Sequence, residues 1–216
     1  MLQSKLFRGA QIIVLILLVV GCEKKASEEI DFGTINNSVY KNNYFGMTAT
    51  LPSDWSIQSQ EAQKRTLKTG GKLLAGDDKN LNAVLKASEL RVVNLFAASQ
   101  YPKGAPVSYN SSIAAVAENV RDLPGIKRGS DYHFHTKQLL QSSSLDLSFP
   151  KDIYTQSLGG VDFDVMEVEI HVRGITVRQK YYAAVMKGYA VSIIISFTTS
   201  EDEASLQKIL DTVKFN

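Results

Sequence analysis

The sequence predicts a mixed α+β domain built on an antiparallel sheet, and its carboxyl-terminal third carries the observations that predict it. Four strand-like runs follow one another there, each separated from the next by two turn-forming residues, a spacing typical of tight hairpins. The last run, YAVSIIISF, is apolar on both sides, as expected of a central strand covered on both faces. The runs cover residues 153–158, 161–172, 175–186 and 189–197, and the turns are Gly159-Gly160, Arg173-Gly174 and Lys187-Gly188.

A terminal helix follows this meander. Ser200 and Glu203 form an S-x-x-E capping box, in which each side chain satisfies a backbone donor of the first turn. The apolar residues that come next recur at helical spacing and are Leu206, Ile209, Leu210 and Val213. We expect this apolar stripe to lie on the sheet, because a helix of mixed polarity buries its apolar face.

The second strand-like run changes phase along its length. Val161, Phe163 and Val165 alternate with acidic residues, whereas the later apolar residues begin at Met166 and recur at every second position. Successive side chains of a strand point to opposite faces. The shift by one position therefore predicts a β-bulge near Val165-Met166.

The segment YKNNYFGMTATLPSDW, residues 40–55, predicts a short strand that ends in a proline turn. Its F-G-x-T-x-x-L-P-x-x-W pattern, the later G-G-x-x-F and Lys-Gly hairpins and the final Val-Lys-Phe resemble the PsbP-like superfamily, over residues 40–55 and 159–215. That superfamily includes the photosystem II protein PsbP and the Ran-binding Mog proteins. The resemblance implies an α/β/α sandwich around a central antiparallel sheet, usually without catalysis.

The middle of the chain predicts further elements. Helices are expected over residues 77–88 and 130–141, and a strand over residues 90–98. Residues 111–120, SSIAAVAENV, have helical spacing and helix-forming alanines, but the resemblance places a strand there. We favour the strand, because a sheet covered on both faces accepts apolar residues without alternation. Gly70-Gly71 is interpreted as a turn.

In the helix expected over residues 130–141, Tyr132, Leu139 and Leu140 should face inward. The same segment contains His133 and His135, the members of an H-x-H pair. Residues two apart lie about 200° apart around a helix, so the two rings should diverge. We therefore expect no metal site here, and no stoichiometric zinc, copper or manganese in the purified domain.

The amino terminus predicts export and lipidation. Lys5 and Arg8 precede nine consecutive apolar residues, 12–20, which is about half the length of a membrane-spanning helix and is typical of a signal peptide. Leu18-Val19-Val20-Gly21-Cys22 resembles the bacterial lipobox, which implies that residues 1–21 are removed and Cys22 is acylated. A buried or reactive free thiol is the alternative for Cys22, the one cysteine of the chain.

The mature chain divides into a tether and a domain. Residues 22–38 are polar and charged, which predicts a flexible, lipidated tether. Residues 39–216 predict one globular domain. The acyl chains would anchor it to a membrane, in the bacterial cell envelope. Glu23 is not the aspartate associated with inner-membrane retention in enterobacteria, which favours the outer membrane and leaves the inner membrane as the alternative.

The charge balance excludes some partners. The chain carries 24 Lys and Arg against 22 Asp and Glu. Removal of residues 1–21 takes away Lys5 and Arg8, so the mature chain has 22 basic and 22 acidic side chains. Nucleic-acid binding needs a concentrated basic face. We expect no nucleic-acid partner and, on the same balance, no polybasic membrane-binding surface.

No residue pattern indicates catalysis or a cofactor. Glu167, Glu169 and His171 share one face of a strand, but a turn at Arg173-Gly174 would place Glu169 opposite Arg178 and Glu167 opposite Lys180, as cross-strand ion pairs. No G-x-S-x-G elbow accompanies the serines. A Ser-His-Asp site assembled from distant residues stays open, because such sites are recognised by geometry.

Two classes of function follow. The leading hypothesis is a non-catalytic, membrane-anchored lipoprotein that binds another envelope component, with an envelope protein as the expected partner. It depends on the lipobox, the neutral mature charge and the superfamily resemblance. The alternative is a surface-tethered hydrolase or small-ligand-binding protein. A deep pocket that gathers a histidine with a serine or carboxylates would favour the alternative.

Overall fold

Tight turns set up the central sheet. In each of the three predicted hairpins both turn residues have positive φ angles, as a type I′ turn requires. The φ values are 58° and 85° at Gly159 and Gly160, 51° and 80° at Arg173 and Gly174, and 51° and 79° at Lys187 and Gly188. The consecutive strands pair antiparallel across these turns, so the predicted meander is confirmed.

The structure is a computed structural model and describes residues 30–216. Its main sheet has eight strands in the order β4-β5-β6-β11-β10-β9-β7, with β8 also paired to β9. Residues 111–120 contain a strand and not a helix, as favoured. The strands are β4 (Ser56–Ile57), β5 (Val92–Ser99), β6 (Ser112–Asn119), β7 (Leu147–Ser148), β8 (Tyr154–Leu158), β9 (Val161–Val172), β10 (Ile175–Met186) and β11 (Tyr189–Phe197).

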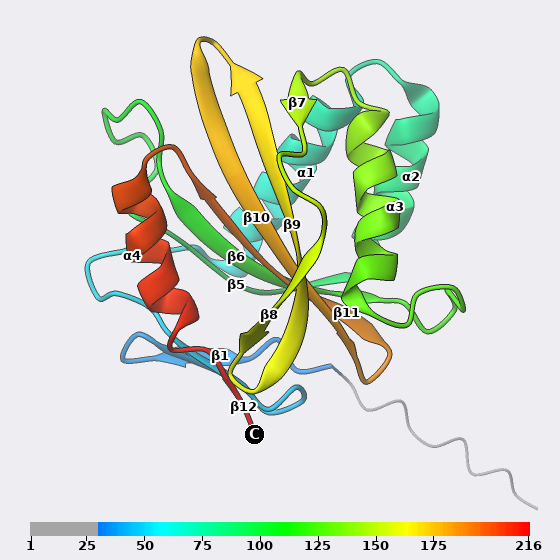
Figure 1. Cartoon of the computed structure of the whole chain (residues 1–216). Coiled ribbons are helices and arrows are strands. Elements are labelled where there is room, and N and C mark those ends of the chain that lie inside the picture. Colours follow the sequence, from blue (N-terminus) through cyan, green and yellow to red (C-terminus); the bar gives the residue numbers. More distant parts are fainter. Residues whose placement is uncertain (1–29) are drawn as a thin grey trace, which may run out of the picture. The chain divides into compact units, whose positions relative to one another are not determined.

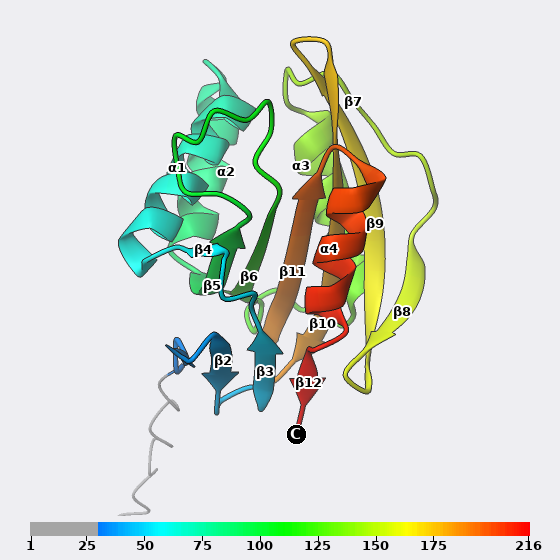
Figure 2. The ribbon, with the colours of Figure 1, turned by 90° about the vertical axis from the view of Figure 1, so that its left-hand side faces the viewer.

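Helices cover both faces of this sheet, so the expected α+β sandwich around an antiparallel sheet is confirmed. Figure 2 shows α4 on the near side of the sheet and the other three helices on the far side. Leu140 of α3 packs on Met166 and Val168, which point to the far side. The helices are α1 (Gln60–Ala75), α2 (Lys79–Glu89), α3 (Gly129–Gln141) and α4 (Ser200–Leu210) (Figure 1).

A second sheet, in the order β1-β2-β3-β12, covers one end of the face that carries α4. The Tyr40 ring lies 4.8 Å from that of Phe96 in β5, and Phe215 lies 5.7 Å from Phe163 in β9. The strands are β1 (Thr34–Asn36), β2 (Val39–Asn42), β3 (Met47–Thr50) and β12 (Lys214–Phe215).

This sheet shortens the expected tether of residues 22–38. Strand β1 pairs with β2 across a turn at Asn37 and Ser38, both of which have positive φ angles. The Asp31 carboxylate accepts a 2.8 Å hydrogen bond from the Gly33 N–H. The folded part therefore begins at Asp31 and not at residue 39. Polarity predicted a tether, but a short edge strand can be polar on both faces.

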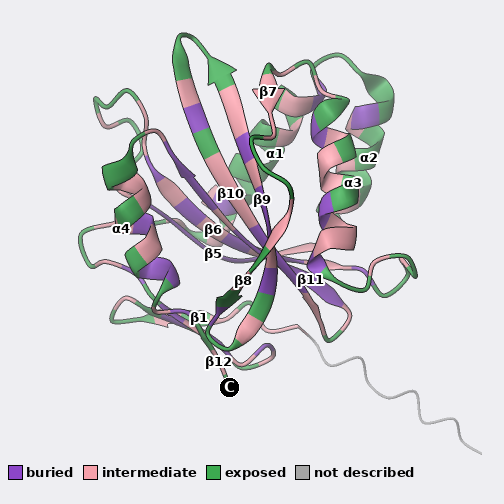
Figure 3. Ribbon diagram, in the orientation of Figure 1, coloured by how far each residue is buried: buried purple, intermediate pink, exposed green. Residues whose placement is uncertain are grey.

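The largest core lies between the main sheet and α4 with the second sheet. Strand β6 shows the asymmetry: Ile113, Ala115 and Ala117 on that side are fully buried, whereas the residues between them are half-buried. Figure 3 shows the same concentration of buried residues on the central strands. A smaller core lies under α3, so both faces of the sheet are covered.

The bulge predicted near Val165-Met166 is wrong. Residues 164–172 pair with β10 in an unbroken register. Phe163 and Val165 lie in the larger core, whereas Met166 and Val168 lie in the smaller core under α3. The strand passes from one core to the other, so the buried face changes without an extra residue. The register shift on this sheet lies instead in β5, between Asn94 and Phe96.

Two local predictions also need correction. Thr199, not Ser200, is the N-cap of α4, and its hydroxyl accepts a hydrogen bond from the Asp202 N–H. Gly70 and Gly71 lie inside α1 and do not form a turn. Helix α1 packs at the edge of the sheet with Gln63 and Ala75 as its buried residues, so it needs no continuous apolar stripe.

Candidate functional site

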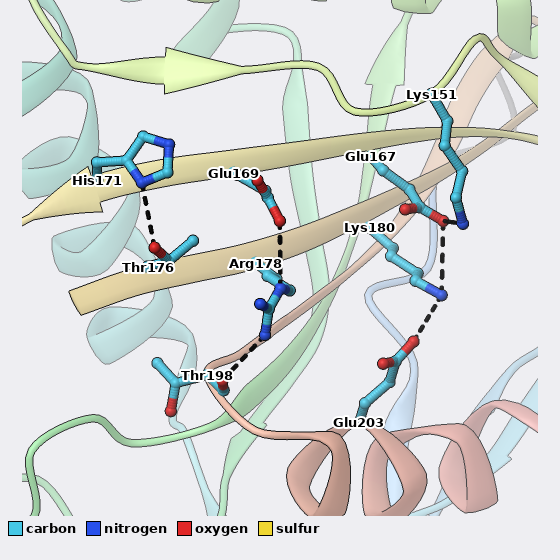
Figure 4. Close-up of polar contacts among 9 residues, drawn as sticks. All are labelled: Lys151, Glu167, Glu169, His171, Thr176, Arg178, Lys180, Thr198 and Glu203. Carbon is cyan, nitrogen blue, oxygen red and sulfur yellow. Dashed lines mark hydrogen bonds and ion pairs between the residues drawn. The ribbon is translucent and has the colours of Figure 1, made fainter.

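The charged stripe of β9 forms the expected cross-strand ion pairs. Glu169 lies opposite Arg178, and Glu167 lies opposite Lys180. Their nitrogen–oxygen distances are 3.2 Å and 3.6 Å (Figure 4). The third member of the stripe, His171, is exposed and lies within hydrogen-bond distance, 3.1 Å, of the Thr176 hydroxyl. The three side chains are thus bonded separately and do not converge.

Glu167 is the centre of this network. Its carboxylate accepts hydrogen bonds from the Tyr154 hydroxyl at 2.8 Å and from Lys151 at 3.1 Å. Lys180 also bridges to Glu203 of α4 at 2.6 Å. Burial opposes ionisation of Glu167, but these donors and the lysine charges outweigh it and hold its pKa below the ordinary 4.5. A carboxylate that is ionised and fully bonded joins the sheet to α4 and is a poor general base.

Replacing Glu167 with glutamine should lower the free energy of unfolding by about 1 kcal/mol at pH 7, because charge-assisted hydrogen bonds are lost. The folded pKa is depressed, so this contribution is present above the unfolded pKa and is lost as the pH falls through the folded pKa. The difference between wild type and variant should shrink under acid conditions. Urea unfolding at pH 7 and at acid pH measures it.

The matched control is Glu169→Gln. Its side chain is 28% exposed against 12% for Glu167, and its ion-pair partner is Arg178 alone. A partly exposed pair contributes less than a buried network, so the effect should be clearly smaller. Equal effects of the two substitutions at pH 7 would contradict a central role for Glu167.

The histidines diverge as the helix predicts. His133 is buried and donates from Nε2 to the Asp164 carbonyl oxygen at 2.9 Å, whereas His135 is exposed. Burial lowers the pKa of His133, so its ring is neutral at pH 7. Within residues 30–216 no three His, Cys, Asp or Glu side chains are grouped closely enough to hold a metal ion. His133 and His135 therefore do not lie in a common site.

The candidate site is a groove between α2 and α3, which the sequence did not predict. Its volume is about 620 Å³, within the range of ligand pockets. The hollow beside the Glu167 network is far smaller, at about 130 Å³. Apolar side chains from α2, α3 and the loop before α3 line the groove, namely Val84, Ala87, Leu123, Pro124, Ile126 and Leu139.

A small polar network lies in this groove. The Glu118 carboxylate of β6 accepts from the Ser88 hydroxyl at 2.9 Å and from the Tyr132 hydroxyl at 2.8 Å. Burial, and then the Glu118 charge, raises the pKa of Tyr132 well above its ordinary value. Tyr132 therefore remains a neutral donor. The network joins α2, β6 and α3 behind an apolar lining and leaves Arg91 and His135 among the polar groups of the groove.

The hydrogen-bond order in the groove does not match nucleophilic catalysis. A serine nucleophile donates its proton to an imidazole, and a carboxylate orients that imidazole. Here Ser88 donates directly to Glu118, and the exposed His135 ring makes no hydrogen bond to any residue that the structure describes. The arrangement can hold an apolar group and present a few polar contacts at its rim.

The groove residues come from parts of the chain far apart in the sequence. Ser88 and Glu118 are separated by 30 residues, and Tyr132 follows 14 residues later. The one local indication was the expectation that Tyr132 and Leu139 face inward. They are half-buried because they border the groove. Cys22, the predicted lipidation site, lies outside the described residues.

Comparisons with known proteins give remote structural likenesses only. No family model and no curated protein matches the chain. A solution structure of cyanobacterial PsbP from Synechocystis has a TM-score of 0.47 at 10% identity, over 85% of this chain and 96% of that chain. LpqN of Mycobacterium tuberculosis, described as involved in cell envelope biogenesis, has a TM-score of 0.41 at 14% identity, over 78% and 83%.

A Pseudomonas aeruginosa protein of unknown function has a TM-score of 0.41 at 10% identity, over 81% of this chain and 93% of that chain. At such identities, and with TM-scores below 0.5, these likenesses identify no ligand, partner or activity. The chemistry of the chain's own groove is the guide to its function.

Proposed function

We propose that the mature protein is a lipid-anchored, non-catalytic binding module of the bacterial envelope. Cys22 carries the acyl chains, and the domain stands on the outer membrane facing the periplasm. The groove between α2 and α3 holds an apolar segment of another envelope protein. The observation that carries this proposal is the groove itself, which combines a volume of about 620 Å³ with an apolar lining.

The side chains that could do chemistry support binding over catalysis. Glu167 and Glu169 are engaged in ion pairs, and Glu118 is engaged by two hydroxyl groups. Catalytic groups are commonly recognised by perturbed pKa values at a shared cleft. The depressed pKa of Glu167 instead reflects a bonded, ionised carboxylate. The groove, in contrast, presents an apolar lining that includes Val84, which is 54% exposed.

The second candidate is a surface-tethered hydrolase or small-ligand binder. It is favoured by one observation, the presence of Ser88, Glu118 and His135 around the same groove. Hydrolysis would require the His135 ring to move between the other two side chains, because Ser88 donates directly to Glu118. Loss of biological activity in a His135→Ala variant that still binds the partner would favour the hydrolase.

Anchoring by acyl chains is the proposed route to the membrane. No helix within residues 30–216 is long and apolar enough to cross a bilayer. Two or three acyl chains contribute about 0.8 kcal/mol for each methylene that they bury, which is sufficient for stable attachment. A module held at the membrane meets partners in the same thin layer at raised effective concentration.

Substitution of Val84 tests the groove. Val84 is 54% exposed on α2 and lines the groove, so Val84→Arg places a charge there without disturbing the core. Partner binding should weaken by about tenfold or more, because an unpaired charge is costly to bury. The measurement is the yield of a photo-crosslink from position 139 to a protein in native membranes, compared with the wild type.

The control is Val107→Arg, which adds the same charge at a valine that is 39% exposed outside the groove. It should leave the crosslink unchanged. Equal crosslinking in the wild type and the Val84→Arg variant would show that the α2–α3 groove is not the binding site. The folded state of both variants is checked by urea unfolding.

A further inference from the structure

Helices α1 and α2 concentrate basic charge that the whole-chain balance conceals. The two helices carry six of the 22 basic side chains of the mature sequence and two of its 22 acidic side chains. The expectation of no basic membrane-facing surface relied on the net charge alone. All six basic residues have exposed side chains, and we name them the basic surface: Lys64, Arg65, Lys68, Lys72, Lys79 and Lys86.

Helical spacing brings these residues together. Arg65, Lys68 and Lys72 lie at positions i, i+3 and i+7 of α1, and Lys79 and Lys86 lie seven residues apart on α2. Gly76, Asp77 and Asp78 join the helices into a hairpin, with φ of 51° at Gly76, so residues 60–89 contain six basic and four acidic residues. Four lysines of the basic surface line a groove of about 480 Å³ between the two helices.

No residue of the basic surface forms a salt bridge in the described part of the chain, although Glu61 lies one turn before Arg65 and Glu89 lines the same groove as the lysines. The salt bridges among residues 30–216 use Arg128, Lys151, Arg178 and Lys180, all outside α1 and α2. Asp78, which could have paired with these lysines, instead caps α2 by accepting hydrogen bonds from the Asn80 and Leu81 N–H groups. The positive charge is therefore available to an external anion.

Exposed leucines accompany the charge. Leu73 is 68% exposed and Leu90, directly after α2, is 90% exposed. Figure 3 shows exposed residues along α1 and α2. Basic residues beside exposed large apolar residues are typical of helices that lie on a lipid surface. A surface made for a soluble anion would gain nothing from these leucines.

The opposite side of the sheet carries charges of both signs. Helix α4 lies there and begins with three acidic residues, Glu201, Asp202 and Glu203, but it also carries Lys208. Helix α4 therefore has no excess of basic residues with which to bind an anionic surface. The strand β1, where the folded chain begins, lies on the left in Figure 2, as α1 and α2 do.

We propose that α1 and α2 dock on the anionic phospholipid surface of the membrane to which Cys22 is anchored. The inference depends on the proposed anchor for its setting. Nine residues, 22–30, connect Cys22 with the folded part and can span at most about 30 Å when fully extended. The domain is thus held close to lipid headgroups, and docking on α1 and α2 leaves α4, on the other side of the main sheet, facing away from the membrane.

Vesicle binding tests this docking without the acyl chains. The mature chain, residues 22–216, carries Cys22→Ser so that no lipid is attached. It should co-sediment with phosphatidylcholine vesicles that contain phosphatidylglycerol, and not with vesicles of phosphatidylcholine alone. Binding should fall steeply with added salt, because exposed charges are screened. Equal binding to both kinds of vesicle, or to neither, would overturn the proposal.

Charge reversal locates the contact. Lys68→Glu with Lys72→Glu should weaken binding by roughly 30-fold or more, since each basic residue at an anionic surface contributes about a fivefold change in affinity. The control, Lys208→Glu with Lys214→Glu, makes the same change in net charge on exposed residues of α4 and β12. Equal losses in the two double variants would overturn docking by α1 and α2.

The outcomes separate this inference from the proposed function. If acylation of Cys22 is detected but the unacylated chain ignores anionic vesicles, the anchor stands and the docking is wrong. If the chain sediments only when a membrane protein is included, the lipid proposal is wrong and binding through the α2–α3 groove accounts for the result.

Discussion

Replacing Gly129 with alanine should lower the free energy of unfolding by about 1–3 kcal/mol, the usual cost of overpacking a filled site. Gly129 is the first residue of α3 and lies against β10. A Cβ atom at this position would lie 1.9 Å from the carbonyl oxygen of Ala183, which is backbone and cannot rotate away. Helix α3 would have to move off the sheet. Urea unfolding measures the loss.

The displacement would also disturb the polar contacts that hold α3. The Ser130 N–H donates to the Asp164 carboxylate at 2.6 Å, and His133 donates to the Asp164 carbonyl oxygen. Because α3 forms one wall of the α2–α3 groove, we expect the variant to bind its partner more weakly as well. An unfolding free energy equal to that of the wild type would mean that α3 does not approach β10 this closely.

The control for this prediction is Gly70→Ala. Gly70 lies inside α1, its φ is not positive, and a Cβ atom there would meet nothing within 4 Å. Alanine is preferred to glycine in a helix by about 0.5–1 kcal/mol. This variant should therefore be more stable than the wild type. The two substitutions are chemically identical, so opposite signs would isolate the close approach at Gly129.

The carboxyl-terminal sheet could be predicted because its turns are local. The second residue of each two-residue turn is glycine. A turn of fixed length sets the register of the strands that it joins. The pairing of Glu169 with Arg178 and of Glu167 with Lys180 follows from that register alone, and the structure confirms it.

Predictions that depended on how an element packs against the rest of the fold were wrong. The phase change in β9 arises because the strand enters one core with Phe163 and another with Met166, and no local pattern distinguishes this from a bulge. Helix α1 was missed because its lysines and paired glycines resemble a loop. Its N-cap, Ser59, whose hydroxyl accepts from the Ala62 N–H, was the available local sign.

The groove could not be predicted from spacing. Its polar network is assembled from three elements, with Ser88, Glu118 and Tyr132 brought together only when α2 and α3 lie beside β6. The basic surface was missed because the prediction used only the net charge of the mature chain, which is zero. Helical spacing over residues 60–89 was sufficient to place the lysines on common faces.

Replacing Cys22 with serine should abolish the incorporation of labelled palmitate and leave an uncleaved precursor. In the lipobox resemblance the acyl group is attached at the cysteine before the signal peptide is removed, so a serine blocks both steps. Cys22 is the one cysteine of the chain, which makes a loss of label easy to interpret. The measurements are metabolic labelling and the size of the protein on a gel.

A displaced cysteine is the matched control. Cys22→Ser combined with Ser27→Cys returns a thiol to the chain five positions later, where Lys24, Lys25 and Ala26 precede it in place of Leu18-Val19-Val20-Gly21. This variant should remain unlabelled, because the position after the apolar run determines acylation and the thiol alone does not. Equal labelling of the Cys22→Ser protein and the wild type would contradict the lipid anchor at Cys22. The proposed docking of α1 and α2 would then lose its setting, because nothing would hold the domain at the membrane.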